Sequence, residues 1–439
     1  MATNQFDVIV IGGGPAGSTA ASLLAGKGWT VCLLEKACHP RFHIGESLLP
    51  MNLPILEQLG VLAAVEKIGV KKYAAEFNSP DTLRPLDTFY FSESLTQNPP
   101  YAYQVLRSEF DYLLLNNSRK KGVTVIENIT VTDVNLDQEG VNTVAAIDSQ
   151  NQLKHYQSRY VIDASGRDTF LSSKLKLKRN NPQHRMAAIY GHFNNVTRRS
   201  GKDQGNISIY WFKHGWLWMI PLPKGVMSVG AVCWPDYMKT RTTSLDEFLT
   251  STIAQIPEMA ARMQQATPVG KVNASANYSY SSTRMHGDGY IIIGDAYAFV
   301  DPVFSSGVYL AMRSAVLGSE LVDSCLRNAD EIKQVTKAFE TEVKIGIKAF
   351  SWFIYRFNAY SLRHLLMHNP GKQASTHFKM VKAAVISVFS GDIFNRPTLL
   401  VPLLIFKINY YLLSVANAKK NLVFWQRRLV SSLWKTNKS

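Results

Sequence analysis

The sequence predicts an α/β fold in which a unit built on a parallel sheet is interrupted by an inserted β-sheet and followed by a helical region. Three observations lead to this prediction. An apolar run from Phe6 to Ile11 ends in a glycine-rich turn, strand-like alternation fills residues 183 to 283, and aromatic helical segments dominate beyond residue 341. With 439 residues, 46% of them hydrophobic, the chain is long enough to bury more than one core.

The first unit has the order strand, turn, helix, strand. Phe6 to Ile11 is typical of a buried parallel strand, and the small residues from Ser18 to Gly26 indicate a helix. The turn between them has G-x-G-x-x-G spacing, which lets the backbone approach a pyrophosphate at the helix N-terminus. Its small residues are Gly12, Gly14, Ala16 and Gly17. Glu35 ends the second strand, where it can accept a hydrogen bond from a ribose hydroxyl, so we expect FAD or NAD rather than NADP.

Positive charge is concentrated at the C-terminal end. The formal net charge is +15, and residues 361 to 439 contain twelve Lys or Arg and one acid, Asp392. Three interpretations of this basic region stay open: a solvated face, a docking surface for an acidic acyl or peptidyl carrier protein, and contact with an anionic membrane surface. Nucleic acid is not expected as a partner, because no motif that reads it is present.

The same region contains the longest apolar run, from Thr398 to Ala418. Lys407 and Asn409 interrupt it, so we expect a helix that caps the core or lies against a surface rather than one that spans a membrane. The four cysteines are scattered without metal-site spacing, and the N-terminus enters a strand with no leader pattern. These features predict a disulfide-free, metal-free, cytoplasmic protein, with peripheral membrane contact as the alternative left open by the basic region.

Three further blocks carry a family resemblance. They are "VLRSEFDYLLL", which contains Arg107, "RYVIDASGRDT", and "GYIIIGDAYAFVDPVFSSGVYLAM", which contains Asp295. In this order they resemble the FAD-binding fold shared by aromatic hydroxylases, geranylgeranyl reductases and flavin-dependent halogenases. The resemblance implies a Rossmann-like FAD-binding domain of the aromatic hydroxylase type, with Arg107 and Asp295 at the phosphate and ribitol groups.

Two finer motifs resemble the flavin-dependent halogenases in particular. "HIGESLLP", from His43 to Pro50, is similar to the segment that covers the flavin, and "WLWMIP" fits the W-x-W-x-I-P pattern of that family. The resemblance implies an FADH2-dependent halogenase of secondary metabolite biosynthesis, similar to the phenol, pyrrole or carrier-protein-dependent subgroup. The implied FAD-binding residues are Gly12, Gly14, Ala16, Gly17, Glu35, Lys36, Ser47, Arg107, Asp295 and Gly307.

The family's chemistry implies roles for a lysine and an aromatic barrier. Hypohalous acid made at a flavin C4a-hydroperoxide must travel to a second pocket, where a lysine forms a haloamine or polarises the oxidant. In "GVKKYAAEF", Lys72 matches the catalytic position, and Lys71 is expected on the opposite face of the strand. A bare lysine pair is otherwise typical of a solvated turn. Trp216, Trp218 and Phe304 are expected between flavin and substrate, with ordinary core packing as the alternative.

The turn "DPVFSSGV" is expected to bind the halide, chloride or bromide, through backbone N–H groups near Ser306 and Gly307. Free-tryptophan halogenases typically have a glutamate where Phe304 stands. Its absence implies a phenol or pyrrole substrate rather than an indole.

The predicted domains are an FAD-binding domain at 1–180 and 283–340, a substrate-facing β-sheet domain at 181–282 and a helical, basic C-terminal region at 341–439. Residues 71–100 contribute to the substrate side. One helix is expected around Leu245 to Gln264. No second G-x-G-x-x-G motif follows a strand, so a separate flavin reductase is expected. "ISVFSGDIF" resembles the tail of phenolic and carrier-dependent halogenases and favours an aromatic substrate that is free or carrier-bound.

Two other functions stay open. A flavin monooxygenase, a dehydrogenase or an enzyme like geranylgeranyl reductase would share the fold and keep Lys72 only as scaffold. A non-catalytic flavin-binding protein, associated with a membrane or complex through its basic tail, would need no oxygen chemistry.

Overall fold

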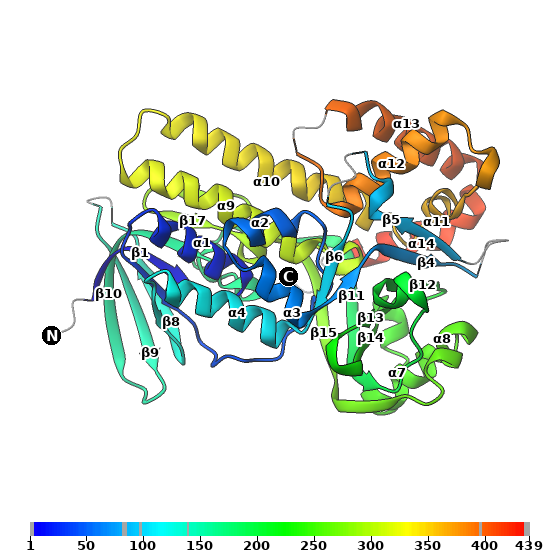
Figure 1. The fold of residues 1–439 in the computed structure, drawn as a ribbon, viewed down its shortest axis with the longest axis horizontal. Helices are drawn as coiled ribbons and strands as arrows, with labels where there is room; N and C mark the ends of the chain where they lie inside the picture. The colour runs from blue at the N-terminus through cyan, green and yellow to red at the C-terminus, as the bar shows by residue number, and fades with distance from the viewer. Residues whose placement is uncertain (1–3, 81–85, 96–98, 138–139, 395–396, 434–439) are drawn as a thin grey trace.

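The computed structural model describes residues 4–80, 86–95, 99–137, 140–394 and 397–433, and it contains two eight-stranded sheets. Figure 1 shows the first sheet with the N-terminal segments and the second beneath the C-terminal helices. The first sheet has the order β16-β17-β10-β1-β2-β7, with β8 and β9 joined beside β10. Its strands are β1 (Gln5–Ile11), β2 (Val31–Leu34), β7 (Thr124–Ile126), β8 (Ile129–Asn135), β9 (Asn142–Asp148), β10 (Leu153–Asp163), β16 (His286–Gly287) and β17 (Tyr290–Ile292).

The centre of the first sheet is parallel and buried. Val8, Ile9 and Val10 in β1 are fully buried because β1 lies between β10 and β2 and shares one apolar core with α1. The predicted N-terminal strand and helix are therefore confirmed, although the helix begins at Pro15 rather than Ser18. The helices associated with this sheet are α1 (Pro15–Gly26), α4 (Arg107–Lys120), α5 (Phe170–Lys174) and α9 (Ser306–Leu326).

The second sheet has the order β18-β15-β11-β14-β13-β12-β4-β5 and is mostly antiparallel. Its strands are β4 (Ala74–Asn78), β5 (Leu86–Tyr90), β11 (Lys178–Asn194), β12 (Ile207–Phe212), β13 (Gly215–Pro221), β14 (Met227–Cys233), β15 (Thr267–Ser282) and β18 (Ala298–Phe299). The three strands predicted in its middle, β12 to β14, are confirmed. β13 alternates: Trp216, Trp218 and Ile220 enter the central core, whereas Leu217 and Met219 pack on the other face.

The prediction of a single helix around Leu245 to Gln264 is wrong. Two helices occupy this stretch, α7 (Leu245–Ile253) and α8 (Pro257–Arg262), after the short α6 (Pro235–Met238). Pro257 has no N–H for a continuing helix and forces the preceding residue, Ile256, into an extended conformation. Ser244 begins α7 with a capping box that uses Glu247.

A small two-stranded sheet and two helices join the large sheets. β3 (Gly69–Lys72) pairs antiparallel with β6 (Ala102–Val105), next to α2 (Asn52–Gln58) and α3 (Leu62–Ile68). The β3 alternation confirms that its two lysines face opposite ways: Lys71 is partly exposed and pairs with Glu66, whereas Lys72 is 1% exposed.

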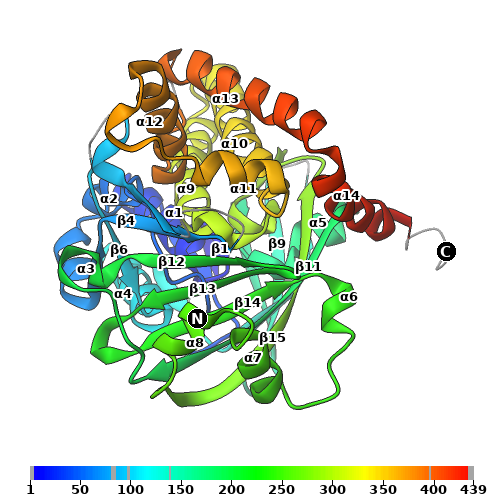
Figure 2. The same cartoon turned by 90° about the vertical axis from the view of Figure 1, so that its right-hand side faces the viewer.

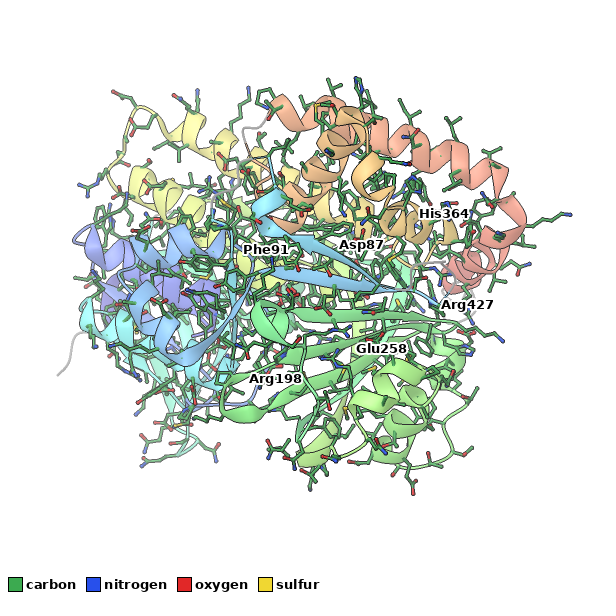
Figure 3. All side chains as sticks on the ribbon, turned by 45° about the vertical axis from the view of Figure 1, so that its right-hand side comes forward. Asp87, Phe91, Arg198, Glu258, His364 and Arg427 are labelled. Atoms are coloured by element: carbon green, nitrogen blue, oxygen red, sulfur yellow. The ribbon has the colours of Figure 1, made fainter. Side chains whose placement is uncertain are left out.

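The C-terminal helices cover one side of the second sheet (Figure 2). They are α10 (Ile332–Ile354), α11 (Tyr360–Met367), α12 (Thr376–Ser390), α13 (Pro397–Ala416) and α14 (Ala418–Leu433). Figure 3 shows Asp87 on β5 and Phe91 on the 3₁₀ turn that follows it, beside these helices. The Lys382 ammonium of α12 lies 3.1 Å from the Asp87 carboxylate, and this buried pair fixes α12 to β5.

Candidate active site

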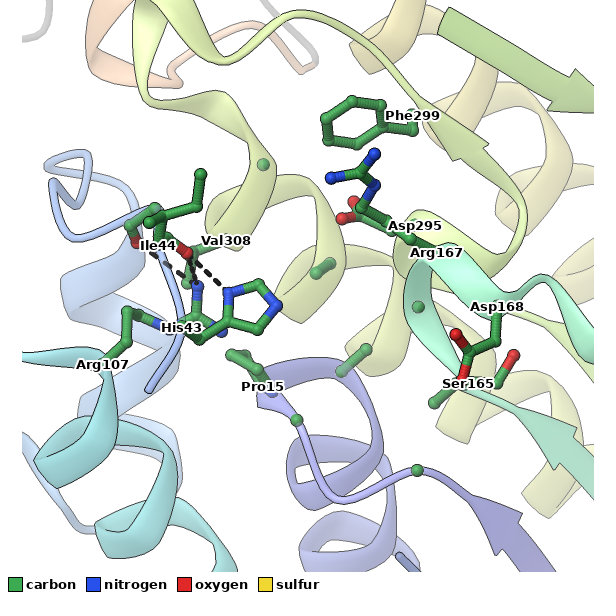
Figure 4. Close-up of a pocket in the computed structure, with 18 of the residues that line it drawn as sticks. Pro15, His43, Ile44, Arg107, Ser165, Arg167, Asp168, Asp295, Phe299 and Val308 are labelled. Carbon is green, nitrogen blue, oxygen red and sulfur yellow. Dashed lines mark hydrogen bonds between the residues drawn. The ribbon is translucent and has the colours of Figure 1, made fainter. Parts of the chain in front are cut away.

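A cavity of about 440 Å³ lies where the first sheet, the second sheet and the N-termini of α1 and α9 meet. Its wall runs from Glu35 after β2 to Trp216 and Trp218 on β13. Figure 4 shows it between Arg107 and Asp168. The site lies beyond the carboxyl ends of β1 and β2, which is where open α/β sheets bind ligands.

Glycines form the floor of the cavity. A Cβ atom on Gly17 would lie 1.9 Å from the Gly12 carbonyl oxygen, and one on Gly12 would lie 2.4 Å from the Ala164 oxygen. Gly12 also has φ +103°, which favours glycine. Gly14 is the N-cap of α1 without a capping side chain, and among the residues that the structure describes only the Arg41 guanidinium comes within 4 Å of its Cβ position. Uncapped N–H groups beside a cation fit a pyrophosphate.

Glu35 is fixed at the end of the cavity next to β2. It is buried, and its two carboxylate oxygens accept from the Gly13 N–H at 2.6 Å and the Ala37 N–H at 2.8 Å. The exposed Lys36 forms an ion pair with Asp168 across the cavity mouth. Glu35 and Lys36, both predicted from the sequence, line the cavity. The Glu35 carboxylate keeps lone pairs for a ribose hydroxyl.

Arg107 holds the segment that begins at His43. Its guanidinium makes two hydrogen bonds to Asp111, at 2.7 and 2.9 Å, and donates to the Ile44 carbonyl at 2.7 Å (Figure 4). The Arg107 charge, followed by burial, lowers the pKa of His43 to about 4, so this imidazole is neutral near pH 7. Arg107 therefore lines the cavity as a cation already neutralised by Asp111.

Asp295 lies opposite, on the 3₁₀ turn Gly294–Ala296. Burial raises its pKa to about 6, although Arg107 and Arg167 act in the opposite direction. The Arg167 guanidinium lies 5.0 Å from the centre of the Phe299 ring, and Figure 4 shows it beside Asp295. An acceptor of this kind suits the hydroxyl groups of a cofactor chain.

The N-terminus of α9 opens toward the same cavity. Ser305 precedes the helix at φ 57° and ψ 21° without capping it. A Cβ atom on Gly307 would meet nothing within 4 Å, and Gly307 lines the cavity. Ser306 is buried and lines a separate void of about 30 Å³ behind the turn, which Gly307 also borders. Uncapped N–H groups at this helix start can bind an anion.

The Lys72 amine is buried, and Ser47 separates it from the cavity. It donates to the Ser47 hydroxyl at 2.9 Å and the Leu48 carbonyl at 3.1 Å, and it lies 5.1 Å from the centre of the Phe91 ring. Burial lowers its pKa to about 7. Ser47 lines the cavity and Lys72 does not, so the amine lies behind the cavity wall.

The predicted barrier residues divide into two groups. Trp216 and Trp218, with ring centres 5.7 Å apart, line the cavity, and the Trp218 indole donates to the Ser228 hydroxyl at 3.1 Å. Phe304 does not line the cavity; its ring stacks on Phe389 at 4.3 Å, inside the core beneath the C-terminal helices.

Most of the predicted cofactor residues meet at this cavity. The lining contains Gly12, Gly14, Ala16, Glu35, Lys36, Ser47, Arg107, Asp295 and Gly307. Gly17 supports the turn from outside the lining. The sequence analysis missed Arg41 and Arg167, which also line the cavity. Arg167 follows a glycine at φ 63° directly after β10, a local signal that could have been used, whereas nothing near Arg41 in the sequence distinguishes it from other surface arginines.

Comparison with known proteins gives concordant matches. The FAD binding domain family model matches residues 5–331. The 1H-pyrrole-2-carbonyl-(peptidyl-carrier protein) chlorinase of Pseudomonas fluorescens is 31% identical over 82% of this chain and 85% of its own length. The tryptophan 2-halogenase of Chondromyces crocatus is 34% identical over 76% of this chain, which spans 64% of that relative.

Two solved structures extend the likeness to the whole fold. A flavoprotein/dehydrogenase from Cytophaga hutchinsonii superposes with a TM-score of 0.85 at 28% identity, over 94% of this chain and 99% of that one. The myxobacterial chondrochloren halogenase superposes with a TM-score of 0.76 at 32% identity, over 89% of this chain and 91% of that one.

Proposed function

The chain belongs to the FAD-binding family and, within it, to the flavin-dependent halogenases, and from this premise we propose that Lys72 transfers the halogen to an electron-rich phenol or pyrrole ring. The main support is the contact between the Lys72 amine and Ser47, 2.9 Å long, which brings a buried amine to the back of the cofactor cavity without exposing it there. When bound and reduced, FAD supplies the activation of dioxygen that oxidises chloride or bromide.

The environment of Lys72 suits an amine that takes up an electrophilic halogen. With a pKa of about 7, Lys72 is neutral in about half of the protein molecules at pH 7, and its nitrogen then has a free lone pair. The lone pair of the neutral amine forms a bond to the halogen of hypohalous acid, the oxygen–halogen bond breaks, and the departing hydroxide takes a proton from the amine and leaves as water. The aromatic carbon then takes the halogen, loses its own proton and restores the amine. The protonated form, which donates to Ser47 and Leu48, is the alternative state that polarises the oxidant by hydrogen bonding.

The cavity wall supports the separation between cofactor and substrate that halogenation requires. Trp216, Trp218 and Ile220 put three large side chains along one side of the cavity. We propose that they exclude the aromatic substrate, so that only the small halogen species passes toward Ser47. The halide is assigned to the Ser306 and Gly307 N–H groups at the start of α9, where the helix dipole favours an anion.

The ring type follows from Phe304 and from the relatives. Phe304 stands where free-tryptophan halogenases have a glutamate, and its aromatic packing leaves no carboxylate to assist an indole. A phenol or pyrrole is activated by its own hydroxyl or ring nitrogen. The name of the Pseudomonas relative includes a pyrrole on a carrier protein, whereas that of the Chondromyces relative names tryptophan. We favour the pyrrole or phenol, free or carrier-bound, with reduced flavin supplied by a separate reductase.

The division into domains belongs to the same proposal. Residues 181–282 contribute most of the second sheet, and β4 and β5 within 71–100 extend it beside Lys72. The FAD-binding part is then 1–180 with 283–340. Residues 341–439, which include α12 and α13, close the substrate side. The basic charge of this last region suits an acidic carrier protein or an anionic membrane.

The test compares two adjacent lysines on opposite faces of β3. Lys72→Ala is expected to abolish halogenation, whereas Lys71→Ala, which removes a partly exposed side chain paired with Glu66, keeps the parent rate. Intact mass spectrometry after incubation with free phenols, free pyrroles and aryl carrier proteins, in mixed chloride and bromide with a flavin reductase, identifies the product. Product formed at full rate by Lys72→Ala would refute the role of this lysine. Oxygenated or dehydrogenated products without halogen would instead favour the chemistry suggested by the name of the Cytophaga neighbour.

A further inference from the structure

The last two helices of the chain expose an unusual amount of apolar surface. Figure 2 shows α13 and α14 along the outer edge of the molecule, outside α10 and α11. One stripe of α13 is buried against the body, with Leu399, Pro402, Phe406, Tyr410 and Ser414. The opposite side of both helices, which we call the outer apolar face, consists of Leu400, Val401, Leu404, Ile405, Ile408, Tyr411, Leu412, Val415, Leu422, Val423, Trp425 and Leu429.

The exposure of this face is high for a protein in water. Leu400 is 70% exposed, Leu412 64% and Val415 78%. Surface helices normally turn polar side chains outward, and contiguous apolar surface of this kind marks an interaction site. Within the described ranges, α13 is the one helix with the length and mean hydropathy, 1.8, to cross a membrane, yet only 28% of its apolar stretch is buried. The outer apolar face therefore needs a partner.

The inner stripe determines how α13 can meet that partner. The Trp352 ring of α10 packs against Phe406 and Tyr410, at 6.1 and 5.3 Å between ring centres. A helix fixed to the body along its length can lie in an interface, but it cannot cross a bilayer without leaving the core. Helices with one apolar and one tethered face lie parallel to the membrane surface.

Charge identifies the chemistry of the partner. Residues 397–433 contain five cationic side chains and no Asp or Glu: Lys407, Lys419, Lys420, Arg427 and Arg428. Arg427 pairs with Asp236 at 3.0 Å, and the Lys407 amine lies 5.4 Å from the centre of the inner Trp352 ring. The exposed charges are therefore those of Lys419 and Lys420, and a symmetric contact with a second copy would bring them toward one another. An acidic carrier protein would satisfy the charge, but it leaves unexplained an apolar face that continues over two helices. An anionic bilayer matches both properties.

We propose that the outer apolar face of α13 and α14 docks on a membrane surface that contains anionic phospholipids. The apolar side chains enter the boundary between headgroups and acyl chains. Tyr411 and Trp425 lie at headgroup level, where aromatic rings with a polar edge are favoured. The exposed Lys419, at the junction of the two helices, contacts the phosphate groups. Lys420, whose amine donates to the Tyr360 hydroxyl at 3.0 Å, adds positive charge beside it. Docking of this kind does not depend on the halogenation chemistry.

The experiment is flotation of the purified full chain with vesicles of phosphatidylcholine, with and without phosphatidylglycerol. Flotation is expected with the anionic vesicles and is expected to weaken as salt rises. The double variant Leu404→Ser, Leu412→Ser is expected to bind roughly tenfold or more weakly, since two buried leucines are lost. Lys419→Gln is expected to bind roughly fivefold more weakly, because one positive charge is removed near the surface. The matched control is Leu153→Ser, which changes an equally exposed leucine, 57% exposed, on the distant β10.

All the changed side chains are exposed, so each variant is expected to fold. Retained FAD binding confirms that it does. The absence of flotation with every vesicle would overturn the proposal. So would a monomer–dimer equilibrium lost in the double variant, which would make the face an interface between copies. Protection of α13 from hydrogen exchange by an aryl carrier protein, but not by vesicles, would assign the face to carrier docking instead. None of these outcomes alters the Lys72 test, so the two proposals fail separately.

Discussion

Replacement of Lys72 by methionine tests the burial of its amine through protein stability. Methionine keeps the length of the side chain and removes its charge. Burial lowers the pKa of Lys72 from its ordinary value of 10.5 to about 7. At about 1.36 kcal/mol for each pKa unit, keeping the amine protonated in the folded protein costs about 5 kcal/mol relative to the unfolded chain. The variant loses hydrogen bonds to Ser47 and Leu48, which offsets about 1–3 kcal/mol. Lys72→Met is therefore expected to be more stable than the parent by about 3 kcal/mol below pH 7.

The sign of the pH dependence follows from proton counting. Between pH 7 and 10.5 the unfolded chain keeps a proton on Lys72 that the folded chain has lost, so the stability of the parent rises with pH across this window. The methionine variant lacks this term, and its advantage shrinks by about 1.4 kcal/mol for each pH unit above 7, to near zero by about pH 9. Urea unfolding at several pH values measures the difference, with Lys71→Met as the control that shows no such trend. A stability difference between variant and parent that does not change with pH would refute a buried Lys72 amine with a lowered pKa.

Three other changes test the cofactor site and its surroundings. Gly17→Ala puts a Cβ atom 1.9 Å from the Gly12 carbonyl and is expected to raise the FAD dissociation constant at least roughly tenfold in a fluorescence titration, whereas Gly26→Ala, with nothing within 4 Å, leaves it unchanged. FAD affinity is expected to fall as the pH drops through about 6, where protonation of the Asp295 carboxylate removes a hydrogen-bond acceptor; Asp295→Asn should lose this dependence in the same titration. Phe304→Glu buries an unpaired carboxylate in an aromatic core and is expected to cost about 3 kcal/mol or more by thermal unfolding, and a fully stable variant would show that the site has room for an acid.

The N-terminal unit was predictable because its determinants are local. The apolar run of β1, the glycine spacing and Glu35 lie within one stretch. Gly12 and Gly17 are required by close contacts with the Ala164 and Gly12 carbonyls, inside that stretch or at the end of the adjacent strand. The alternation of Trp216 and Trp218 is equally local, since side chains on a strand repeat every two residues. The missed break before Pro257 was also a local signal, and it was overlooked rather than absent.

The surroundings of Lys72 were not predictable in the same way. The sequence indicates which lysine faces inward, but the depressed pKa depends on Ser47, Leu48 and Phe91, which come from segments far from β3 along the chain. The orientation of Phe304 is a similar case. It points away from the cavity because Phe389 of α12 stacks on it, and a contact between residues 85 positions apart in the sequence has no local pattern.

The C-terminal helices therefore do more than cover the sheet. The 3₁₀ turn that carries Phe91 over the Lys72 amine is held by α12: the Ser387 hydroxyl accepts from the Leu95 N–H at 2.9 Å, and Lys382 pairs with Asp87 at 3.1 Å. Because α12 packs against α13, the helix proposed to meet lipid is connected to the amine proposed to carry the halogen through α12 and the turn that carries Phe91. A partner that displaces α13 would thus change the burial of Lys72, and with it the pKa that makes the neutral amine available. Docking through the outer apolar face leaves the inner stripe of α13 on the body, so vesicles should leave the pH at which halogenation is half-maximal unchanged.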